Sequence, residues 1–218
     1  MIAIDGPSGS GKSTVARAVA SRLGLRYLDT GAMYRALTWW CLQRGVDLGD
    51  TDAVARAATD LPLSMHTDPT APGVVVEQTD VSEAIRSTEI SESVSAVATN
   101  LAVRDEMVRR QRAIIADGGW VAEGRDITTV VAPDADVRLL LLARVDARLS
   151  RRARDVHGAD DPDAVAATRD QVVRRDARDS TVAAFTEAAE GVAVIDSSDL
   201  TVEQTVQAVL DLLAKDAS

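Results

Sequence analysis

One stretch decides the fold class of this chain: Gly6-Pro7-Ser8-Gly9-Ser10-Gly11-Lys12-Ser13. It satisfies the pattern G-x-x-x-x-G-K-S/T, in which glycines let the backbone approach phosphate oxygens and successive N–H groups face the anion. An apolar run at residues 2–4 precedes the stretch, and Val15, Val19 and Leu23 follow it at helical spacing. The sequence therefore predicts a strand, a phosphate-binding loop and a helix, in that order.

This loop predicts nucleotide binding. Lys12 would reach the β- and γ-phosphates, and the Ser13 hydroxyl would bind Mg²⁺. A glycine-rich turn that caps a helix and binds nothing is the weaker alternative, because the four fixed positions match by chance in roughly one chain in a hundred of this length. Contacts with the nucleotide are expected from Gly6, Pro7, Ser8, Gly9, Ser10, Gly11, Lys12, Ser13 and Thr14.

The rest of the chain has the rhythm of a parallel sheet, because short apolar runs alternate with longer helical patterns. We expect strands at residues 2–4, 27–28, 119–122, 137–143 and 192–195. Helices are expected at residues 12–23, 90–100 and 103–116, followed by a closing helix that carries Val206, Val209, Leu210 and Leu213. The predicted fold class is α/β, with a five-stranded parallel sheet of the P-loop NTPase type flanked by helices.

The length of 218 residues suits one domain. Residues 61–87 differ from the rest, because Pro62, Pro69, Pro72 and Gly73 interrupt them and residues 74–76 have no helical period. We predict a small β-rich insertion there. The core of the domain would comprise residues 1–60, 88–143 and 190–218.

Arginines crowd into residues 144–154, at Arg144, Arg148, Arg151, Arg152 and Arg154. A solvated charged face is the ordinary interpretation of such a run. Here, however, positions 144, 148, 151 and 152 can share one helical face, and the run leads into Gly-Ala-Asp-Asp-Pro at residues 158–162, which is typical of a hinge. We predict an arginine-bearing lid, at about residues 144–165, that closes over phosphates.

The bulk composition excludes several kinds of partner. A net charge of −10 disfavours nucleic acids and anionic membranes, which repel an acidic surface. Cys41 is the only cysteine, so no disulfide can form within the chain. Neither a secretory signal nor a membrane-spanning apolar stretch is visible. We expect a cytoplasmic monomer that binds small molecules.

The loop alone does not distinguish a GTPase switch, a mechanical ATPase and a small-molecule kinase. The guanine-reading motif N-K-x-D is missing. Four stretches together closely resemble the bacterial cytidylate kinase family, and the resemblance runs nearly end to end. These stretches are residues 4–7, 29–35, 80–86, and 123–126 with 129–131. The third stretch lies in the predicted insertion, so the resemblance implies that residues 61–87 belong to the monophosphate-binding region.

The resemblance implies transfer of the γ-phosphoryl group of ATP, with Mg²⁺, to CMP or dCMP, giving CDP or dCDP and ADP. The catalytic residues would be Lys12, Arg125, Arg148 and Arg152. Arg35 and Arg125 would clamp the acceptor phosphate, because guanidinium groups match phosphate oxygens bidentately. The remaining implied contacts are Thr30, Ser95, Arg104 and Asp126 with the cytosine edge, and Arg175 and Asp179 with the ribose. Taken singly, each has an ordinary alternative, such as a surface ion pair on a helix.

The chain also departs from the family pattern. The family usually has an arginine three residues after the aspartate at position 179 and then a proline-leucine pair, but this chain has Val182 and then Ala184-Phe185. The glycine common after residues 125–127 is Thr128 here. The alternative functions are a P-loop kinase for another acceptor, such as UMP, dephospho-coenzyme A or a small hydroxy acid, and a nucleotide-dependent switch without phosphotransfer.

Overall fold

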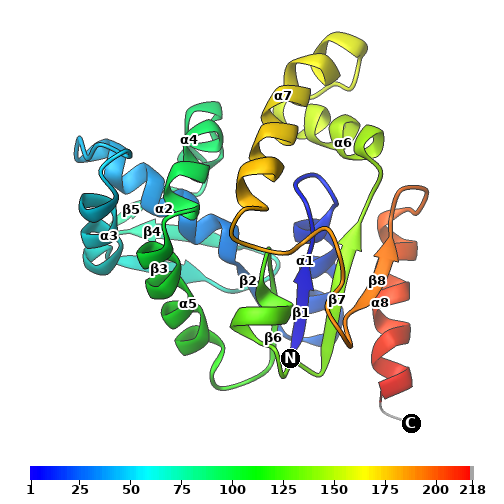
Figure 1. Ribbon diagram of the computed structural model, residues 1–218. Coiled ribbons are helices and arrows are strands. Elements are labelled where there is room, and N and C mark those ends of the chain that lie inside the picture. The colour runs from blue at the N-terminus through cyan, green and yellow to red at the C-terminus, as the bar shows by residue number, and fades with distance from the viewer. Residues whose placement is uncertain (217–218) are drawn as a thin grey trace.

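The centre of the molecule is a parallel five-stranded sheet with the strand order β2-β6-β1-β7-β8 (Figure 1). The computed structural model describes residues 1–216, without the side chains of residues 155–157, 170, 171, 215 and 216. The strands are β1 (Ile2–Asp5), β2 (Arg26–Asp29), β6 (Trp120–Gly124), β7 (Val137–Leu142) and β8 (Ala193–Asp196). The predicted five-stranded parallel sheet and the positions of its strands are therefore confirmed.

Helices cover both faces of this sheet, which explains why β1 and β6 are buried along their whole length. On one face Ile2 and Ile4 pack with α1 (Lys12–Leu23) and α8 (Val202–Asp216). On the other face Ala3 belongs to a larger apolar cluster formed with α2 (Thr30–Gln43), α3 (Thr51–Asp60), α4 (Thr88–Ala98) and α5 (Leu101–Ile115). The alternation along β1 thus sends neighbouring side chains into different layers.

Residues 61–87 contain a second, antiparallel sheet of three strands, β3 (Leu63–His66), β4 (Gly73–Val76) and β5 (Thr79–Asp80). A short 3₁₀ turn, Ala84–Arg86, leads from this sheet to α4. The inward side chains Val74, Val76 and Ile85 are buried in the same cluster as α2. The β-rich segment therefore shares the core of the domain.

The last architectural unit is a helical hairpin that stands beyond the carboxyl ends of the strands (Figure 1). It consists of α6 (Val145–His157) and α7 (Pro162–Asp179). Gly158 ends α6 with a φ of 71°, a left-handed conformation that favours glycine, and the Asp161 side chain caps α7. The predicted lid, residues 144–165, corresponds to α6, the turn after it and the first residues of α7, and α7 continues beyond it to residue 179.

None of the helices in the described part of the chain combines the length and the apolar character needed to cross a membrane.

Candidate active site

The phosphate-binding loop connects β1 to α1 and needs its glycines for two reasons. Gly6 and Gly9 have φ values of 154° and 76°, which side chains rarely adopt. Added Cβ atoms would lie 2.2 Å from the Leu141 carbonyl oxygen at position 6 and 2.6 Å from the Arg148 carbonyl oxygen at position 9. The loop is thus held tightly between β7 and α6.

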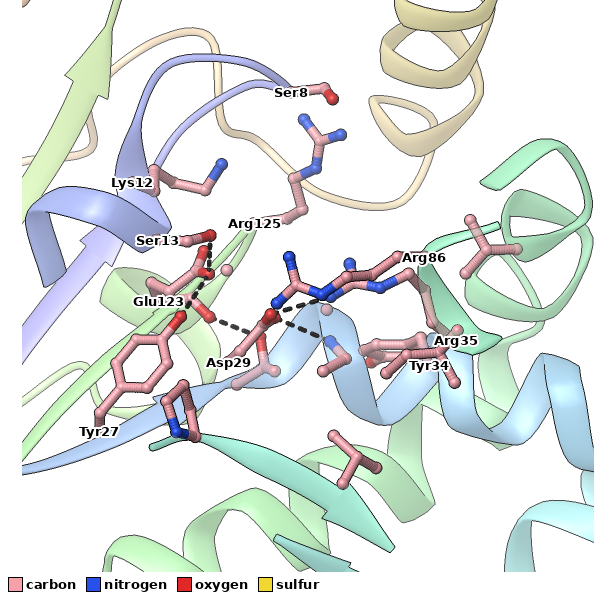
Figure 2. Close-up of a pocket in the computed structure, with 18 of the residues that line it drawn as sticks. Ser8, Lys12, Ser13, Tyr27, Asp29, Tyr34, Arg35, Arg86, Glu123 and Arg125 are labelled. Atoms are coloured by element: carbon pink, nitrogen blue, oxygen red, sulfur yellow. Dashed lines mark hydrogen bonds and ion pairs between the residues drawn. The ribbon is translucent and has the colours of Figure 1, made fainter. Parts of the chain in front are cut away.

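Lys12 opens α1 and faces back across this loop, donating to the Pro7 carbonyl oxygen at 2.9 Å (Figure 2). Burial lowers the pKa of Lys12 to about 8. The free backbone N–H groups at the N-terminus of α1 add positive potential at the same place.

A cavity of about 990 Å³ opens beside the loop and is bounded on its far side by α2, α4, α7 and the β3–β5 region. The predicted residues that line it include Lys12, Ser13, Thr30, Arg35, Arg104, Arg125, Asp126, Arg152, Arg175 and Asp179. Tertiary structure therefore brings most of the predicted donor and acceptor residues to one cavity, whose lining does not include the predicted residues Gly6, Pro7, Ser10, Ser95 and Arg148.

Glu123, at the end of β6, is a site residue that the sequence prediction missed. It accepts a hydrogen bond from the Ser13 hydroxyl at 2.6 Å and one from Tyr27 at 3.2 Å. Burial, followed by the neighbouring charge of Asp29, raises the pKa of Glu123. The available signal was an acid at the carboxyl end of a buried strand, directly before Gly124 and Arg125.

Asp29 supports the entrance to α2, where its side chain accepts from the Ala32 N–H at 2.8 Å. The same carboxylate forms an ion pair with Arg35 at 2.8 Å (Figure 2). Burial raises the pKa of Asp29, but the charge of Arg35 and the hydrogen bond from Ala32 act against this effect, and the pKa lies below its usual value. The arrangement orients the Arg35 guanidinium at the cavity wall.

The predicted cytosine-reading residues lie at three places: Arg104 pairs with Asp126, whereas Thr30 and Ser95 each bind another residue. Arg104 of α5 forms an ion pair with Asp126. Burial raises the pKa of Asp126, and the charge of Arg104 opposes this rise only in part. Thr30 also lines the cavity, while its hydroxyl donates to the Glu123 carbonyl oxygen at 2.8 Å. Ser95 is 3% exposed and donates to Asp179 at 3.0 Å.

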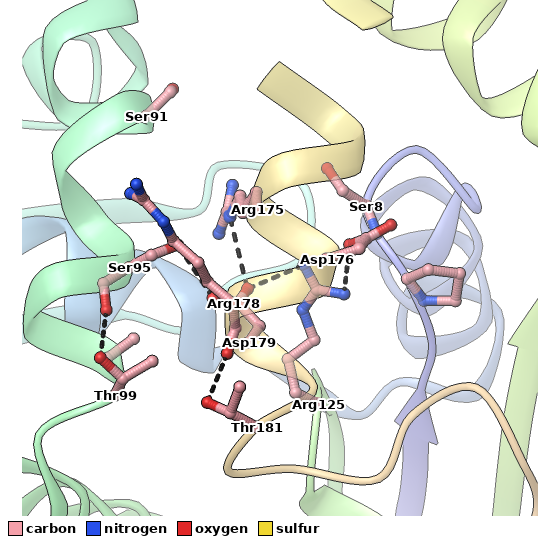
Figure 3. Close-up of polar contacts among 12 residues, drawn as sticks. Ser8, Ser91, Ser95, Thr99, Arg125, Arg175, Asp176, Arg178, Asp179 and Thr181 are labelled. Atoms are coloured by element: carbon pink, nitrogen blue, oxygen red, sulfur yellow. Dashed lines mark hydrogen bonds and ion pairs between the residues drawn. The ribbon is translucent and has the colours of Figure 1, made fainter. Parts of the chain in front are cut away.

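Asp179 of α7 anchors a network of cations (Figure 3). Its carboxylate lies 3.0 Å from an Arg125 nitrogen and 3.6 Å from Arg175 Nε. Burial lowers the pKa of Arg175 to about 10. The Arg125 guanidinium also stacks 4.0 Å from the centre of the Phe185 ring. Arg125 is thus fixed between one aromatic face and the carboxylates of α7.

The arginines of the predicted lid do not all share one face. Arg148 contacts Asp176 and donates to the Ser8 carbonyl oxygen at 3.1 Å, while Arg152 lines the cavity and donates to Ser91 at 3.3 Å. Arg144 precedes α6 and pairs with Asp199 at 2.8 Å. The prediction that Arg144 lies on the same helical face was wrong, because α6 begins only at residue 145.

Comparison with known proteins identifies the family. A model described as "Cytidylate kinase" matches residues 2–215. The chain belongs to the cytidylate kinase family. The cytidylate kinase of Cutibacterium acnes is 47% identical over 98% of this chain and 95% of that protein. The cytidylate kinase of Streptomyces avermitilis is 44% identical over 98% of this chain and 92% of its own length.

A bifunctional pantoate ligase/cytidylate kinase of Synechococcus sp. (strain CC9605) is 45% identical over 98% of this chain, which matches 44% of that longer protein.

The departures from the cytidylate kinase pattern lie at the site. Val182 lines the cavity beside Asp179, so an apolar side chain replaces a cation there. Phe185 is fully buried and provides the ring under Arg125. Thr128 donates through its hydroxyl and its N–H to the buried Asp5 carboxylate, at 2.7 and 2.8 Å. The side chain at position 128 therefore contributes a polar contact beneath the site.

Proposed function

We propose that this chain is a cytidylate kinase that transfers the γ-phosphoryl group of ATP to CMP or dCMP, producing ADP and CDP or dCDP. The observation that carries the proposal is one cavity bounded by the phosphate loop on one side and by Arg35, Arg125 and the Arg104–Asp126 pair on the other. Two anionic nucleotides could meet there with their phosphates between the cations.

On the donor side, the backbone N–H groups of the loop and Lys12 would hold the phosphates of ATP. The hydroxyl of Ser13 and the nearby carboxylate of Glu123 are oxygen ligands that suit Mg²⁺, which prefers one or two carboxylates together with water and phosphate oxygens. Ser13 would bind the ion, and Glu123 and Asp29 would orient its water molecules. Bound Mg²⁺ would supply neutralisation of phosphate charge. Glu123 is poised for this role because its carboxylate already holds the Ser13 hydroxyl.

On the acceptor side, Arg35 and Arg125 would align the monophosphate for in-line attack. This phosphate is largely ionised at neutral pH, since its second pKa is about 6, and needs no strong general base. Catalysis then consists of positioning and charge neutralisation by Lys12, Arg125, Arg148 and Arg152.

Base selection would rest on the pair formed by Arg104 and Asp126. A carboxylate accepts from the N4 amine of cytosine, a donor that uracil lacks. Thr30 and Ser95 would complete the contacts with the base, and Arg175 and Asp179 would hold the ribose. The proposed closing elements are residues 61–87 and the lid at 144–165, which would exclude water from the transfer. We also propose that the protein acts as a monomer in the cytoplasm.

A coupled assay of ADP release tests the proposal with CMP, dCMP, UMP and dephospho-coenzyme A as acceptors. We expect turnover with CMP or dCMP to exceed that with UMP by about 100-fold, because the contact between Asp126 and the N4 amine distinguishes the two bases. Faster turnover with another acceptor would change the substrate. ATP binding without acceptor-dependent ADP release would instead indicate a nucleotide-dependent switch.

A further inference from the structure

The carboxylate of Asp176 lies where the phosphate loop, α6 and α7 meet (Figure 3). It accepts a hydrogen bond from the Ser8 N–H of the loop at 3.2 Å. Arg125 approaches the same carboxylate oxygen to 2.8 Å, and Arg148 binds the second oxygen. The Asp176 side chain is 14% exposed, so these contacts take the place of most of the water that would otherwise surround it.

These donors are of the kind that a bound phosphate requires. A loop N–H, a guanidinium from the strand end and a guanidinium from the lid surround one small anion, as they would surround a phosphoryl group. Burial opposes ionisation, but Arg125 and Arg148 hold the pKa of Asp176 below its usual value. At neutral pH the group is therefore an anion among phosphate-binding donors.

We propose that Asp176 is an internal competitor of the donor phosphates, which occupies the Ser8 N–H, Arg125 and Arg148 and is displaced when ATP binds. Ser8 has only one N–H, so it cannot serve the carboxylate and a phosphate oxygen in full at once. A phosphate at these donors would also repel the carboxylate at close range. The inference rests on the proposed binding of ATP at the loop.

Displacement of Asp176 would connect the two substrate sites. Arg125 bridges Asp176 and Asp179, which lie on the same helix. When phosphate takes over the Asp176 side of Arg125, the guanidinium keeps its contact with Asp179, next to the proposed ribose residue Arg175. Binding of ATP would thus release the contact between Asp176 and the loop, while Arg125 stays in place for the acceptor.

Asp176→Asn tests the proposal, because asparagine keeps the shape of the side chain and removes its charge. We expect the Kd for ATP, measured by isothermal titration without acceptor, to fall about tenfold, a coupling of ordinary size between two competing groups. Asp163→Asn, which changes the same charge at an exposed position of α7, should leave the Kd unchanged. An unchanged or higher Kd in Asp176→Asn would assign Asp176 to orienting the arginines only and would overturn the proposal.

A second measurement uses the unaltered protein, in case the variant is too unstable to titrate. Carbon-13 NMR of the Asp176 carboxyl group gives its pKa with and without inorganic tripolyphosphate. We expect that pKa to rise on binding, because the carboxylate loses its arginine contacts and gains an anionic neighbour. An unchanged pKa with tripolyphosphate bound at the loop would overturn the proposal. If unaltered protein bound no ATP at all, the proposed function itself would fail, which is a distinct result.

Discussion

The donor side and the acceptor side of the cavity are built in different ways. The donor side is contiguous, since residues 6–14 provide the loop, Lys12 and the start of α1. The acceptor side gathers Arg35 from α2, Arg104 from α5, Arg125 after β6 and Arg175 from α7. Backbone N–H groups and Lys12 form the donor side, whereas each acceptor cation is held by a carboxylate: Asp29 for Arg35, Asp126 for Arg104, and Asp179 for Arg125 and Arg175. A site made of backbone is local in sequence, and a site made of paired side chains is not.

The largest effect on turnover should follow from a substitution confined to the donor side of the cavity. Lys12→Met keeps the length of the side chain and removes its charge, so turnover should fall by about 10³-fold. CMP affinity should change little, because the acceptor cations stay paired. Steady-state kinetics and titration with CMP measure both effects. A loss of CMP affinity as large as the loss of turnover would show that the two sides are not separate.

The next largest effect should come from Arg125, which contacts two carboxylates of α7, Asp176 and Asp179. Arg125→Lys keeps the charge but loses the fork that bridges Asp176 and Asp179, and we expect kcat to fall by about 10²-fold. The matched control is Arg109→Lys, because Arg109 is an exposed residue paired with Glu106 on α5. Equal rates in the two variants would remove Arg125 from the mechanism.

A smaller and more selective effect should follow from changing the acceptor side. Asp126→Asn should raise the KM for CMP about tenfold by weakening the contact with the N4 amine. The KM for ATP should stay the same, since Asp126 pairs with Arg104 of α5. Asp105→Asn, which changes an exposed residue next to Arg104 on α5, serves as the control. Equal increases in both KM values would contradict the assignment of Asp126 to the base.

The smallest effect on catalysis should come from Thr128, which lies beneath both sides of the cavity. Its replacement should lower the stability of the fold instead. Thr128→Val removes the hydroxyl that donates to buried Asp5, while the N–H groups of Ile127 and Thr128 remain. We expect the free energy of unfolding to fall by about 1–3 kcal/mol, as measured by urea denaturation. Thr128→Ser keeps the hydroxyl and should lose less. A serine variant as unstable as the valine variant would point to packing rather than to the hydrogen bond.

The sequence predicted the five strands, the phosphate loop and the location of the β-rich segment, because glycines, prolines and apolar periodicity act locally. Most of the site residues that the sequence predicted line the cavity, and the acceptor residues among them came from the family resemblance. It assigned no role to Glu123, Asp29 or Asp176, since an aspartate or glutamate has an ordinary surface alternative at every position. It misplaced Arg144 because a helix boundary can shift by a residue or two and move a side chain to another face.

The sequence by itself determined the donor site, because eight consecutive residues carry both the backbone freedom and the cation that phosphate binding needs. Only the tertiary structure decided which carboxylate holds which arginine. Those choices place Asp29 with Arg35, Asp126 with Arg104, and Asp176 with Arg125 and Arg148. The physical reason is that Coulomb attraction depends on distance and burial in the folded chain, and neither is a property of sequence spacing.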